Sequence, residues 1–345
     1  MIKISQVDST PIALPDRLLA LGGYTLLPQW ALLIEKNYQY RSYRVASSQN
    51  EQITGVLVLT HIKHPVFGNY LVTAPYSSYG GVALPDTAMA TEILDGAGEL
   101  ANRLKAEYVN IRFHDESGSL KAIGHWHNEP NYVTFKIDLT KDLDAIMMGY
   151  GSNHRNHIRK SLKKDLTILF GSTDLLDDAY EGLAKSMHEL GSPYHQKSYL
   201  ASMIEELGEN VLLSVIYKNE KIAGAGVFIR QGDTIINLHA NVLRQFRGDY
   251  AGEFFYWNLI RHFKTIGFST FDLGRSLIGS GNDIFKTKWN PERIPLQYWY
   301  YLKPGQAIPS VNQKNPKFQI AIETWKRLPA FLVRWIGPYL IKGIA

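Results

Sequence analysis

The chain has 345 residues, of which 45% are hydrophobic, 12% aromatic and 20% charged. This length predicts two domains of about 150 residues each, and the composition excludes a disordered chain. The absence of cysteine excludes disulfides, thiolate metal sites and cysteine nucleophiles. The net charge of +5 is the charge of residues 312–345 alone. The rest of the chain is neutral, which argues against a DNA-binding surface.

The first 21 residues lack a basic region followed by a long apolar run, so no signal peptide is expected. A transmembrane helix needs about 18 consecutive apolar residues, and no segment offers them. We therefore expect a cytoplasmic protein.

An internal repeat is the clearest pattern in the sequence. Residues 45–59 and 213–229 each predict a β-hairpin, with tight turns at Asn50-Glu51 and Asn219-Glu220 that lie 169 residues apart. Each hairpin is preceded by a helix and followed by a long amphipathic helix and a strand. These elements are expected at 30–37, 88–107 and 108–113 in the first copy, and at 198–207, 253–266 and 268–273 in the second.

The repeat predicts an α/β (α+β) chain of two tandem domains, each a mixed sheet flanked by helices. The boundary is expected between residues 139 and 152, where the pattern is interrupted. We therefore predict a first domain at 1–145, a second at 146–305 and a basic amphipathic tail at 306–345.

Several motifs accompany this repeat between about residues 25 and 301. They are Trp30, Lys63, Val66-Phe67-Gly68, Ala74-Pro75-Tyr76, Tyr79-Gly80-Gly81, Asn153 to Ser161, Leu190 to His195, Phe271 to Ser276 and Ile284 to Trp289. Together they resemble the Fem-type peptidyltransferase branch of the GNAT acyltransferase superfamily, including its exosortase-associated subgroup. The resemblance implies two GNAT domains that transfer an acyl group, from aminoacyl-tRNA in the best-known members, to an amine of a cell-wall precursor.

Amide formation requires a deprotonated amine, a stabilised oxyanion and aligned substrates, but no metal and no tightly bound cofactor. The segment Asp272 to Ser276 ends a predicted strand with an acid, Gly274 and Arg275. Arg275 is suited to hold a phosphate or carboxylate, with Asp272 orienting it or accepting a proton. The alternative is a structural Asp–Arg pair that fixes the end of the strand.

The following loop contains Gly279 and Gly281, whose backbone amides are suited to hold an anionic group. By the resemblance, Lys286 occupies the position of a lysine that stabilises the oxyanion, and Trp289 lies beside it. The alternative is an ordinary surface lysine.

A basic stretch with helical spacing contains Arg155, Arg159, Lys160, Lys163 and Lys164, and Arg155 and Arg159 share a face that Lys163 extends. Such a row suits a nucleotide diphosphate or tRNA backbone, although solvated charged faces are common. Among relatives, the stretch with Pro193, Tyr194 and His195 lines the substrate cleft. His195 is either a general base or a histidine of a solvent-exposed loop.

The acyl donor stays open between aminoacyl-tRNA and acyl-CoA. Residues 245–250 match two fixed positions of the phosphate-binding pattern of CoA-dependent GNAT enzymes, but Asp249 and Tyr250 would crowd and repel a pyrophosphate. Arg247 still offers a phosphate contact.

In the first copy the strand at 108–113 lacks the acidic motif, so this copy is expected to provide a wall of the acceptor cleft. Lys63 and Tyr79 are the candidate residues, although tyrosine packing explains the loop equally well. The tail from Trp325 to Lys342 mixes tryptophans, aliphatic residues and cations. It is either a segment lying at the inner membrane surface or a terminal helix packed on the second domain.

The sequence therefore predicts an acyl or aminoacyl transferase that acts on a cell-envelope or polysaccharide precursor. The alternatives are an acyl-CoA-dependent N-acetyltransferase with a small amine acceptor and a non-catalytic scaffold. The scaffold would be favoured if Asp272, Arg275 and Lys286 did not come together.

Overall fold

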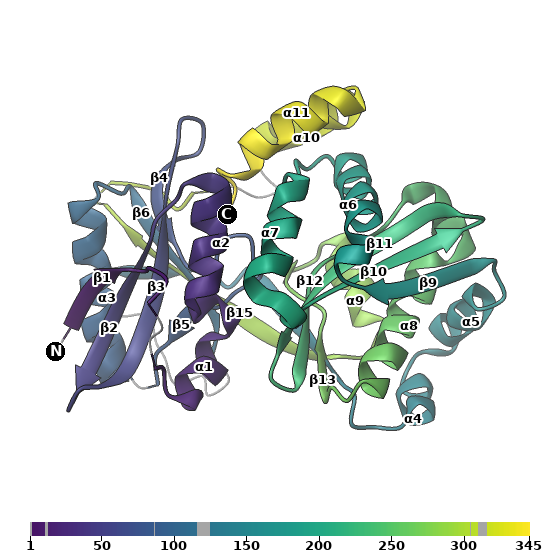
Figure 1. Cartoon of the computed structure of the whole chain (residues 1–345), viewed down its shortest axis with the longest axis horizontal. Coiled ribbons are helices and arrows are strands. Elements are labelled where there is room, and N and C mark those ends of the chain that lie inside the picture. The colour runs from purple at the N-terminus through teal and green to yellow at the C-terminus, as the bar shows by residue number, and fades with distance from the viewer. Residues whose placement is uncertain (1, 11–12, 86, 116–124, 304, 310–315) are drawn as a thin grey trace. The chain divides into compact units, whose positions relative to one another are not determined.

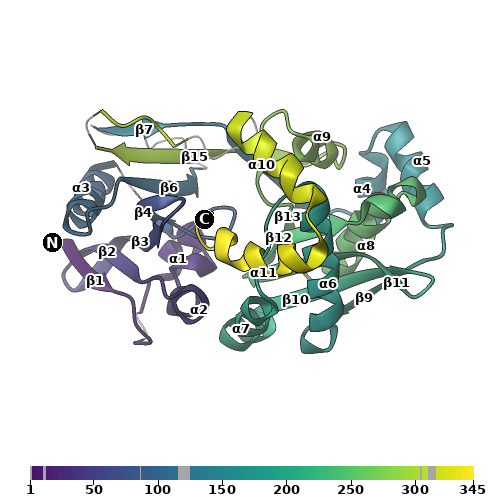
Figure 2. The same ribbon diagram turned by 90° about the horizontal axis from the view of Figure 1, so that it is seen from above.

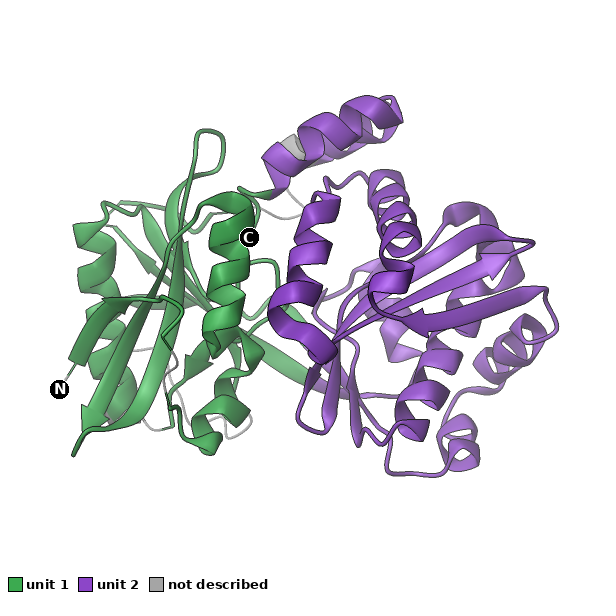
Figure 3. Ribbon diagram, in the orientation of Figure 1, with its two compact units in different colours: residues 1–133, 294–309, 342–345 green, residues 134–293, 310–341 purple. Residues whose placement is uncertain are grey.

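The computed structural model describes residues 2–10, 13–85, 87–115, 125–303, 305–309 and 316–345. Two compact units are distinguished in Figure 3: unit 1 contains residues 1–133, 294–309 and 342–345, and unit 2 contains residues 134–293 and 310–341. Each unit has a mixed sheet with flanking helices, which confirms the predicted fold class.

The units do not follow the predicted segment boundaries. The first unit ends at Val133 because the residues after it pair with a strand of unit 2. Residues 294–309 belong to unit 1, because residues 296–302 pair with the strand at 108–114. The predicted tail is also divided, because residues 310–341 group with unit 2 and residues 342–345 with unit 1.

The sheet of unit 1 has the strand order β1-β2-β3-β4-β6-β15, with β5 beside β3 (Figure 1) and β7 beside β15 (Figure 2). The strands are β1 (Ile2–Gln6), β2 (Ser42–Gln49), β3 (Gln52–His64), β4 (Gly68–Val72), β5 (Val82–Ala83), β6 (Tyr108–His114), β7 (Trp126–Asn128) and β15 (Glu292–Leu302). The helices are α1 (Asp16–Gly22), the 3-10 turn η1 (Tyr24–Leu26), α2 (Pro28–Tyr38) and α3 (Thr87–Arg103).

Helices cover both faces of this sheet because successive strand residues point to opposite sides. Val45 and Leu57 belong to a buried cluster with residues of α3, whereas their neighbours Ala46 and Val56 belong to a cluster with Leu18 of α1. The expected helix at 88–107 is found, but it ends at residue 103.

The sheet of unit 2 has the order β8-β13-β12-β11-β10-β9, with β14 beside β8. The strands are β8 (Tyr132–Asp138), β9 (Leu166–Gly171), β10 (Val211–Lys218), β11 (Lys221–Gln231), β12 (Thr234–Val242), β13 (Thr270–Asp272) and β14 (Ser276–Leu277). The helices are α4 (Leu143–Met148), α5 (Ser152–Ser161), α6 (Leu176–Leu190), α7 (Lys197–Leu207), α8 (Ala251–Thr265), α9 (Gly281–Thr287), α10 (Pro316–Arg327) and α11 (Ala330–Ile341). Short 3-10 turns lie at η2 (Thr173–Leu175), η3 (Gly208–Asn210) and η4 (Arg244–Asp249).

Two long helices sandwich this second sheet. A Cβ on Gly182 of α6 would lie 3.1 Å from Ala225 Cβ of β11, and a Cβ on the next strand residue, Gly226, would lie 3.1 Å from Phe255 Cζ of α8. Because adjacent strand residues face opposite sides, α6 and α8 cover opposite faces. Figure 1 shows the strands between these two helices, and Figure 2 gives the view from the side of α6.

The two predicted hairpins have the same backbone. Asn50 and Glu51 have φ angles of 49° and 66°, and Asn219 and Glu220 have φ angles of 48° and 64°. Positive φ at both turn residues is the signature of a type I′ turn. Each hairpin also has a register shift at the same distance from its turn, after Ser47 in one copy and Ile216 in the other. These shared details support the duplication that the sequence predicts.

Each sheet also contains a short pair of parallel strands. In unit 1, β4 pairs with β6 over three residues, ending at Val72 and Asn110. In unit 2, β12 pairs with β13 over three residues, ending at Ile236 and Asp272, while β12 continues to Val242. Asn110 in the first copy therefore corresponds to Asp272 in the second.

Strand β12 has a bulge next to this pairing. Val227 of β11 pairs with His239 and Phe228 pairs with Asn237, so Leu238 is left without a partner on β11. In the first copy, β3 and β4 pair without a register shift. A bulge turns the side chains around it, and bulges are common beside binding sites.

The tail packs on unit 2 as two helices, α10 and α11, both against α6. His188 Nε2 lies 3.2 Å from the Trp325 carbonyl oxygen, and Arg334 forms an ion pair of 2.5 Å with Glu181. The predicted packing against the second domain is therefore present, although Trp335 remains 79% exposed. No described helix combines the length and the apolarity that a membrane crossing requires.

Candidate functional site

The candidate site begins at the end of β13, where Asp272 pairs with Ile236 of the parallel strand β12. The Asp272 side chain is fully buried, and its Oδ1 accepts hydrogen bonds from Thr134 Oγ1 (2.6 Å) and from the backbone N–H of Gly274 (2.7 Å). Gly274 has a φ of 74°, a conformation that favours glycine. The Asp272 carboxylate therefore fixes the turn that leads to Arg275.

Lys286 of α9 reaches the same turn. Its Nζ donates hydrogen bonds to the carbonyl oxygens of Gly274 (2.8 Å) and Arg275 (3.0 Å), and lies 5.9 Å from the centre of the Phe135 ring. The side chain is 7% exposed, so the alternative of an ordinary surface lysine is wrong. The structure thus brings Asp272, Arg275 and Lys286 together at one turn.

Burial lowers the pKa of Lys286 from 10.5 to about 7. The carboxylates of Asp272 and Asp283 oppose this fall in pKa, whereas the positive charge of Arg275 adds to it. Both protonation states are therefore populated near neutral pH. The ammonium form has one N–H beyond the two that hold the turn, and this N–H is able to donate to a developing oxyanion.

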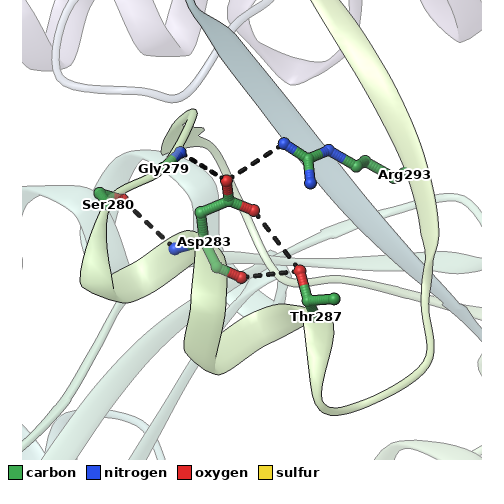
Figure 4. Close-up of polar contacts among 5 residues, drawn as sticks. All are labelled: Gly279, Ser280, Asp283, Thr287 and Arg293. Atoms are coloured by element: carbon green, nitrogen blue, oxygen red, sulfur yellow. Dashed lines mark hydrogen bonds and ion pairs between the residues drawn. The ribbon is translucent and has the colours of Figure 1, made fainter.

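The glycine loop before α9 binds a carboxylate of the chain itself (Figure 4). Asp283 Oδ2 accepts from the Gly279 N–H at 2.7 Å and forms an ion pair with Arg293 Nη2 at 3.1 Å. Ser280 Oγ accepts from the Asp283 N–H at 3.2 Å and so caps the helix. The Gly279 amide, expected to hold a substrate anion, is thus engaged by Asp283, while Gly281 is exposed at the start of α9.

A cluster of aromatic side chains surrounds the predicted His195. The His195 ring is 2% exposed and stacks on Tyr199 at 4.2 Å between ring centres, so the alternative of a solvent-exposed loop histidine is wrong. A second histidine, His239, lies 5.9 Å from His195 and 5.5 Å from the Tyr194 ring. The Tyr194 hydroxyl has no hydrogen-bond partner among the described residues, and Pro193 before it is half-buried.

His239 was not predicted from the sequence. Burial, followed by the charge of Arg275, lowers its pKa to about 4, and its Nε2 has no hydrogen-bond partner in the described part of the chain. The nearby Asn237 donates to the Leu273 carbonyl oxygen at 3.3 Å, across the end of the parallel pair. Asn237 and His239 lie among four polar residues of β12, so nothing in the sequence of this strand singled out His239.

The basic residues of α5 form a separate group near the start of α8. Arg155 is half-buried, and its Nη1 donates to the Tyr150 carbonyl oxygen, so it fixes the turn before α5. Arg159 and Lys160 are exposed, and Lys160 Nζ lies 6.0 Å from the centre of the Tyr250 ring. A phosphate-binding role for this group stays a prediction.

The loop before α8 contains an acid that two lysines neutralise. Asp249 pairs with Lys218 and, at 3.7 Å, with Lys164, and the hydrogen bond from Lys218 is the main reason that the pKa of Asp249 is lowered. Arg247 is exposed in η4, and Tyr250 has a φ of 57° just before the helix. The expected repulsion of a pyrophosphate by Asp249 is therefore weakened by these cations.

Trp289 is a core residue beneath α5. It is 1% exposed, and its ring lies 4.5 Å from His154, 5.4 Å from Tyr150 and 5.6 Å from Tyr256, measured between ring centres. The predicted Ser276 is also buried, and its Oγ has no partner among the described residues. Among the residues that the structure describes, no three His, Asp or Glu side chains lie close enough together to bind a metal ion.

The predicted residues of the first copy lie in unit 1. Lys63 is exposed on β3, and Tyr79 is half-buried with its ring edge-on to His114 at 5.1 Å. Their assignment to a wall of the acceptor cleft stays a prediction.

Comparisons with known proteins concern the domain and the fold. Residues 152–287 match the sequence profile described as the acetyltransferase (GNAT) domain. The fold resembles the crystal structure of FemX, with a TM-score of 0.65 and 14% identity over 84% of this chain and 94% of that one. A comparison with curated proteins finds no match.

Two other solved structures share the fold. L-PGS from Bacillus licheniformis aligns with a TM-score of 0.51 and 14% identity, over 79% of this chain and 86% of that one. A tandem GNAT protein from the clavulanic acid biosynthesis pathway aligns with a TM-score of 0.53 and 11% identity, over 89% of this chain and 100% of that one. At these identities the likeness establishes the fold.

Proposed function

We propose that this chain, an acyltransferase whose residues 152–287 form a GNAT domain, makes an amide bond on an amine of a cell-envelope or polysaccharide precursor. The observation that carries the proposal is the meeting of Asp272, Arg275 and Lys286 at the end of β13. The resemblance of the sequence motifs to the Fem-type peptidyltransferases is the reason for proposing aminoacyl-tRNA as the donor.

In the proposed reaction, the acceptor amine attacks the acyl carbonyl carbon and forms a tetrahedral intermediate. The ammonium form of Lys286 donates a hydrogen bond to the oxyanion, and Arg275 holds an anionic group of a substrate. As the intermediate collapses, a proton from the attacking nitrogen passes to the departing oxygen or sulfur, and the bond from the acyl carbon to that atom breaks.

His195 has a different role in this proposal from the one that its residue type suggests. Burial lowers the pKa of His195 well below its ordinary value, and His239 adds to this effect. An imidazole that resists protonation is a weak base. We therefore assign His195 and Tyr194 to the positioning of a substrate and not to proton removal.

A second candidate is an acyl-CoA-dependent N-acetyltransferase with a small amine acceptor. The cations Lys164, Lys218 and Arg247 beside the start of α8 support it, because this is where backbone amides and positive charge favour a pyrophosphate. Loss of acetyl transfer from acetyl-CoA after substitution of these three residues would favour this candidate.

The surface of α11 supports a peripheral contact with the inner face of the membrane. Phe331 and Trp335 are 70% and 79% exposed, which is the arrangement of an interfacial helix. Such a contact would suit a lipid-linked acceptor.

The test compares donors and acceptors directly. The purified chain is incubated with labelled aminoacyl-tRNA or labelled acetyl-CoA, together with an extract of envelope precursors, and the labelled products are identified by mass spectrometry. We expect label from aminoacyl-tRNA in a precursor amide, and the same precursor unmodified in a deletion strain. Label only from acetyl-CoA in small amines would replace the leading proposal with the second.

The matched variants are Lys286→Met and Lys185→Met. Lys185 is an exposed lysine on α6, so its loss changes the net charge equally but leaves the turn at Gly274 intact. Transfer that survives in the Lys286→Met variant at the rate of the Lys185→Met variant would remove Lys286 from the mechanism.

A further inference from the structure

The carboxylate of Asp283 holds together the short helix that carries Lys286. Its Oδ2 accepts a hydrogen bond from the Gly279 N–H at 2.7 Å, before α9 begins. Its Oδ1 lies 3.4 Å from the hydroxyl of Thr287, the last residue of α9, and that hydroxyl also donates to the Asp283 carbonyl oxygen at 2.8 Å. Figure 4 shows these contacts. Asp283 therefore connects the two ends of α9, and Lys286 lies between them.

Arg293, at the start of β15, compensates the charge of this carboxylate. Its Nη2 lies 3.1 Å from Asp283 Oδ2, and both residues belong to unit 2. The Asp283 side chain is 7% exposed and the Arg293 side chain is 43% exposed. A buried carboxylate is costly unless its charge is paired, and here the partner is a guanidinium that reaches the surface.

Arg293 and Lys286 also lie near the same aromatic ring. Arg293 Cζ is 5.7 Å and Lys286 Nζ is 5.9 Å from the centre of the Phe135 ring, which belongs to β8 and is 1% exposed. Charges interact more strongly across a buried, apolar region than in water. Arg293 is thus close enough to act on the charge of Lys286, both directly and through Asp283.

The charged groups around Lys286 come from several parts of unit 2. They are Asp272 of β13, Lys136 opposite it on β8, Arg275 of the next turn, Asp283 of α9 and Arg293 of β15. The carboxylates of Asp272 and Asp283 favour the ammonium form of Lys286, and the positive charge of Arg275 opposes it. Asp272 and Arg275 belong to the turn that Lys286 holds. Within the described residues, the hydrogen bonds of Asp283 and Arg293 lie outside that turn.

We propose that the ion pair of Asp283 and Arg293 is a positioning device for Lys286, in which the carboxylate fixes the helix that carries the lysine and the guanidinium limits the negative charge that the lysine meets. Neither side chain touches the reacting atoms in this proposal. The inference rests on the proposed role of Lys286 in acyl transfer and adds two residues to it. Because Asp283 favours the ammonium form and Arg293 disfavours it, removal of one charge or the other has opposite effects on Lys286.

The first test measures the pKa of Lys286 by carbon-13 NMR of labelled lysine side chains, with the resonance assigned by its absence from Lys286→Met. Asp283→Asn keeps the shape of the side chain but removes its charge, so the pKa of Lys286 should fall, by about one unit. Arg293→Met removes the opposing charge and should raise this pKa by a smaller amount. Arg293→Lys keeps the charge and should leave the pKa near its wild-type value.

A double variant separates an effect of charge from a damaged helix. Adding Arg293→Met to Asp283→Asn removes two opposite charges together, so part of the fall in the pKa of Lys286 should be recovered. Damage to α9 would instead make the double variant worse than Asp283→Asn alone. That result would overturn the proposal.

The matched controls are an acid and an arginine of unit 2 in similar surroundings. Asp178 is half-buried and accepts a hydrogen bond from the Tyr217 hydroxyl at 2.5 Å, and Arg230 Cζ lies 5.6 Å from the centre of the Phe268 ring. Neither belongs to the charges that act on Lys286. Asp178→Asn and Arg230→Met should therefore leave its pKa unchanged.

The second test follows kcat for acyl transfer against pH. The pH at which kcat declines should move down in Asp283→Asn and up in Arg293→Met, in step with the NMR values. If the pKa of Lys286 fails to move in opposite directions in these two variants, the inference is overturned whatever the rates show. If the pKa moves as expected and the kcat profile does not follow, the ion pair controls Lys286, and the proposed role of Lys286 in the transfer is the part that fails.

Discussion

The two parallel strand pairs, β4–β6 and β12–β13, share a three-residue register and differ in what lies at their ends. The second pair ends in Asp272, and the turn after it is held by Lys286. The first pair has Asn110 at the corresponding place and is filled by residues 342–345, bound through Arg112. The comparison teaches that duplication kept the backbone frame, while the side chains at the strand ends decide what each copy is able to do.

Replacing the cation of each copy should separate the two roles most strongly. We expect Lys286→Met to lower kcat/KM for acyl transfer by about 100-fold or more, the usual effect of losing an oxyanion donor. Arg112→Met should lower it less than about tenfold, because Arg112 contacts the segment 342–345 and not the turn at Gly274. Equal losses in both variants, measured on chains with the same thermal melting profile, would mean that the copies do not divide the work in this way.

Exchanging the acid and the amide between the copies should have a smaller effect. Asp272→Asn removes the charge that favours the ammonium form of Lys286, so the pKa of Lys286 should fall further. A fall of one unit would lower the ammonium fraction, and hence kcat, by about tenfold above that pKa. The activity should recover at lower pH. The reverse exchange, Asn110→Asp, should leave kcat unchanged, and a pH-independent loss in Asp272→Asn would instead indicate a collapsed turn.

The pH dependence of activity should report Lys286 directly. If its ammonium form stabilises the oxyanion, kcat should decline as the pH rises through about 7, the value to which burial lowers this pKa. Lys286→Arg should move this decline upward, because arginine stays protonated. Carbon-13 NMR of labelled lysine side chains would give the pKa independently. A profile that only rises between pH 6 and 9 in both proteins would exclude the ammonium as the active form.

The same group also affects stability, with the opposite dependence on pH. Between pH 7 and 10.5 the unfolded chain retains the lysine proton and the folded chain has lost it, so stability should rise with pH through this window. Below pH 7 both states are protonated, and the full cost of burying the charge remains. Lys286→Met should lack this contribution, which urea unfolding at a series of pH values would measure as a difference between the two proteins.

The smallest effect is expected at the two hairpin turns, where the copies are alike. Glu51 and Glu220 have φ angles of 66° and 64°, a region that favours glycine in type I′ turns. Glu51→Gly and Glu220→Gly should each stabilise the chain, by at most about 1 kcal/mol, because relief of strain exceeds the added entropy of the unfolded state. Thermal melting should show equal shifts. A stabilising change in one hairpin and a destabilising change in the other would contradict their equivalence.

The sequence was sufficient to predict the elements that depend on local patterns. Both Asn-Glu turns and the helices α2, α7 and α8 were found where alternation and amphipathic spacing placed them. Asp272, Arg275 and Lys286 meet at one turn, and their role in acyl transfer stays a prediction. The predicted strand at 268–273 is shorter, because only Thr270 to Asp272 pair with neighbours.

What was missed depends on contacts between distant residues. Nothing local indicates that residues 294–309 return to unit 1, that Leu238 forms a bulge, or that Asp283 occupies the glycine loop. The occupation of unit 1 by residues 342–345 rests on hydrogen bonds to residues more than 200 positions earlier. Such pairings are set by the assembled sheet and not by composition.

The position of β15 in the chain has a consequence for how the protein is made. This strand completes the sheet of unit 1 beside β6, yet it is synthesised only after residues 115–291. Until then β6 has an unpaired edge, and such edges attract strands of other nascent chains. Translation therefore imposes a waiting period during which we expect chaperones, or the ribosome itself, to shield the first half, and products that stop short of β15 to aggregate.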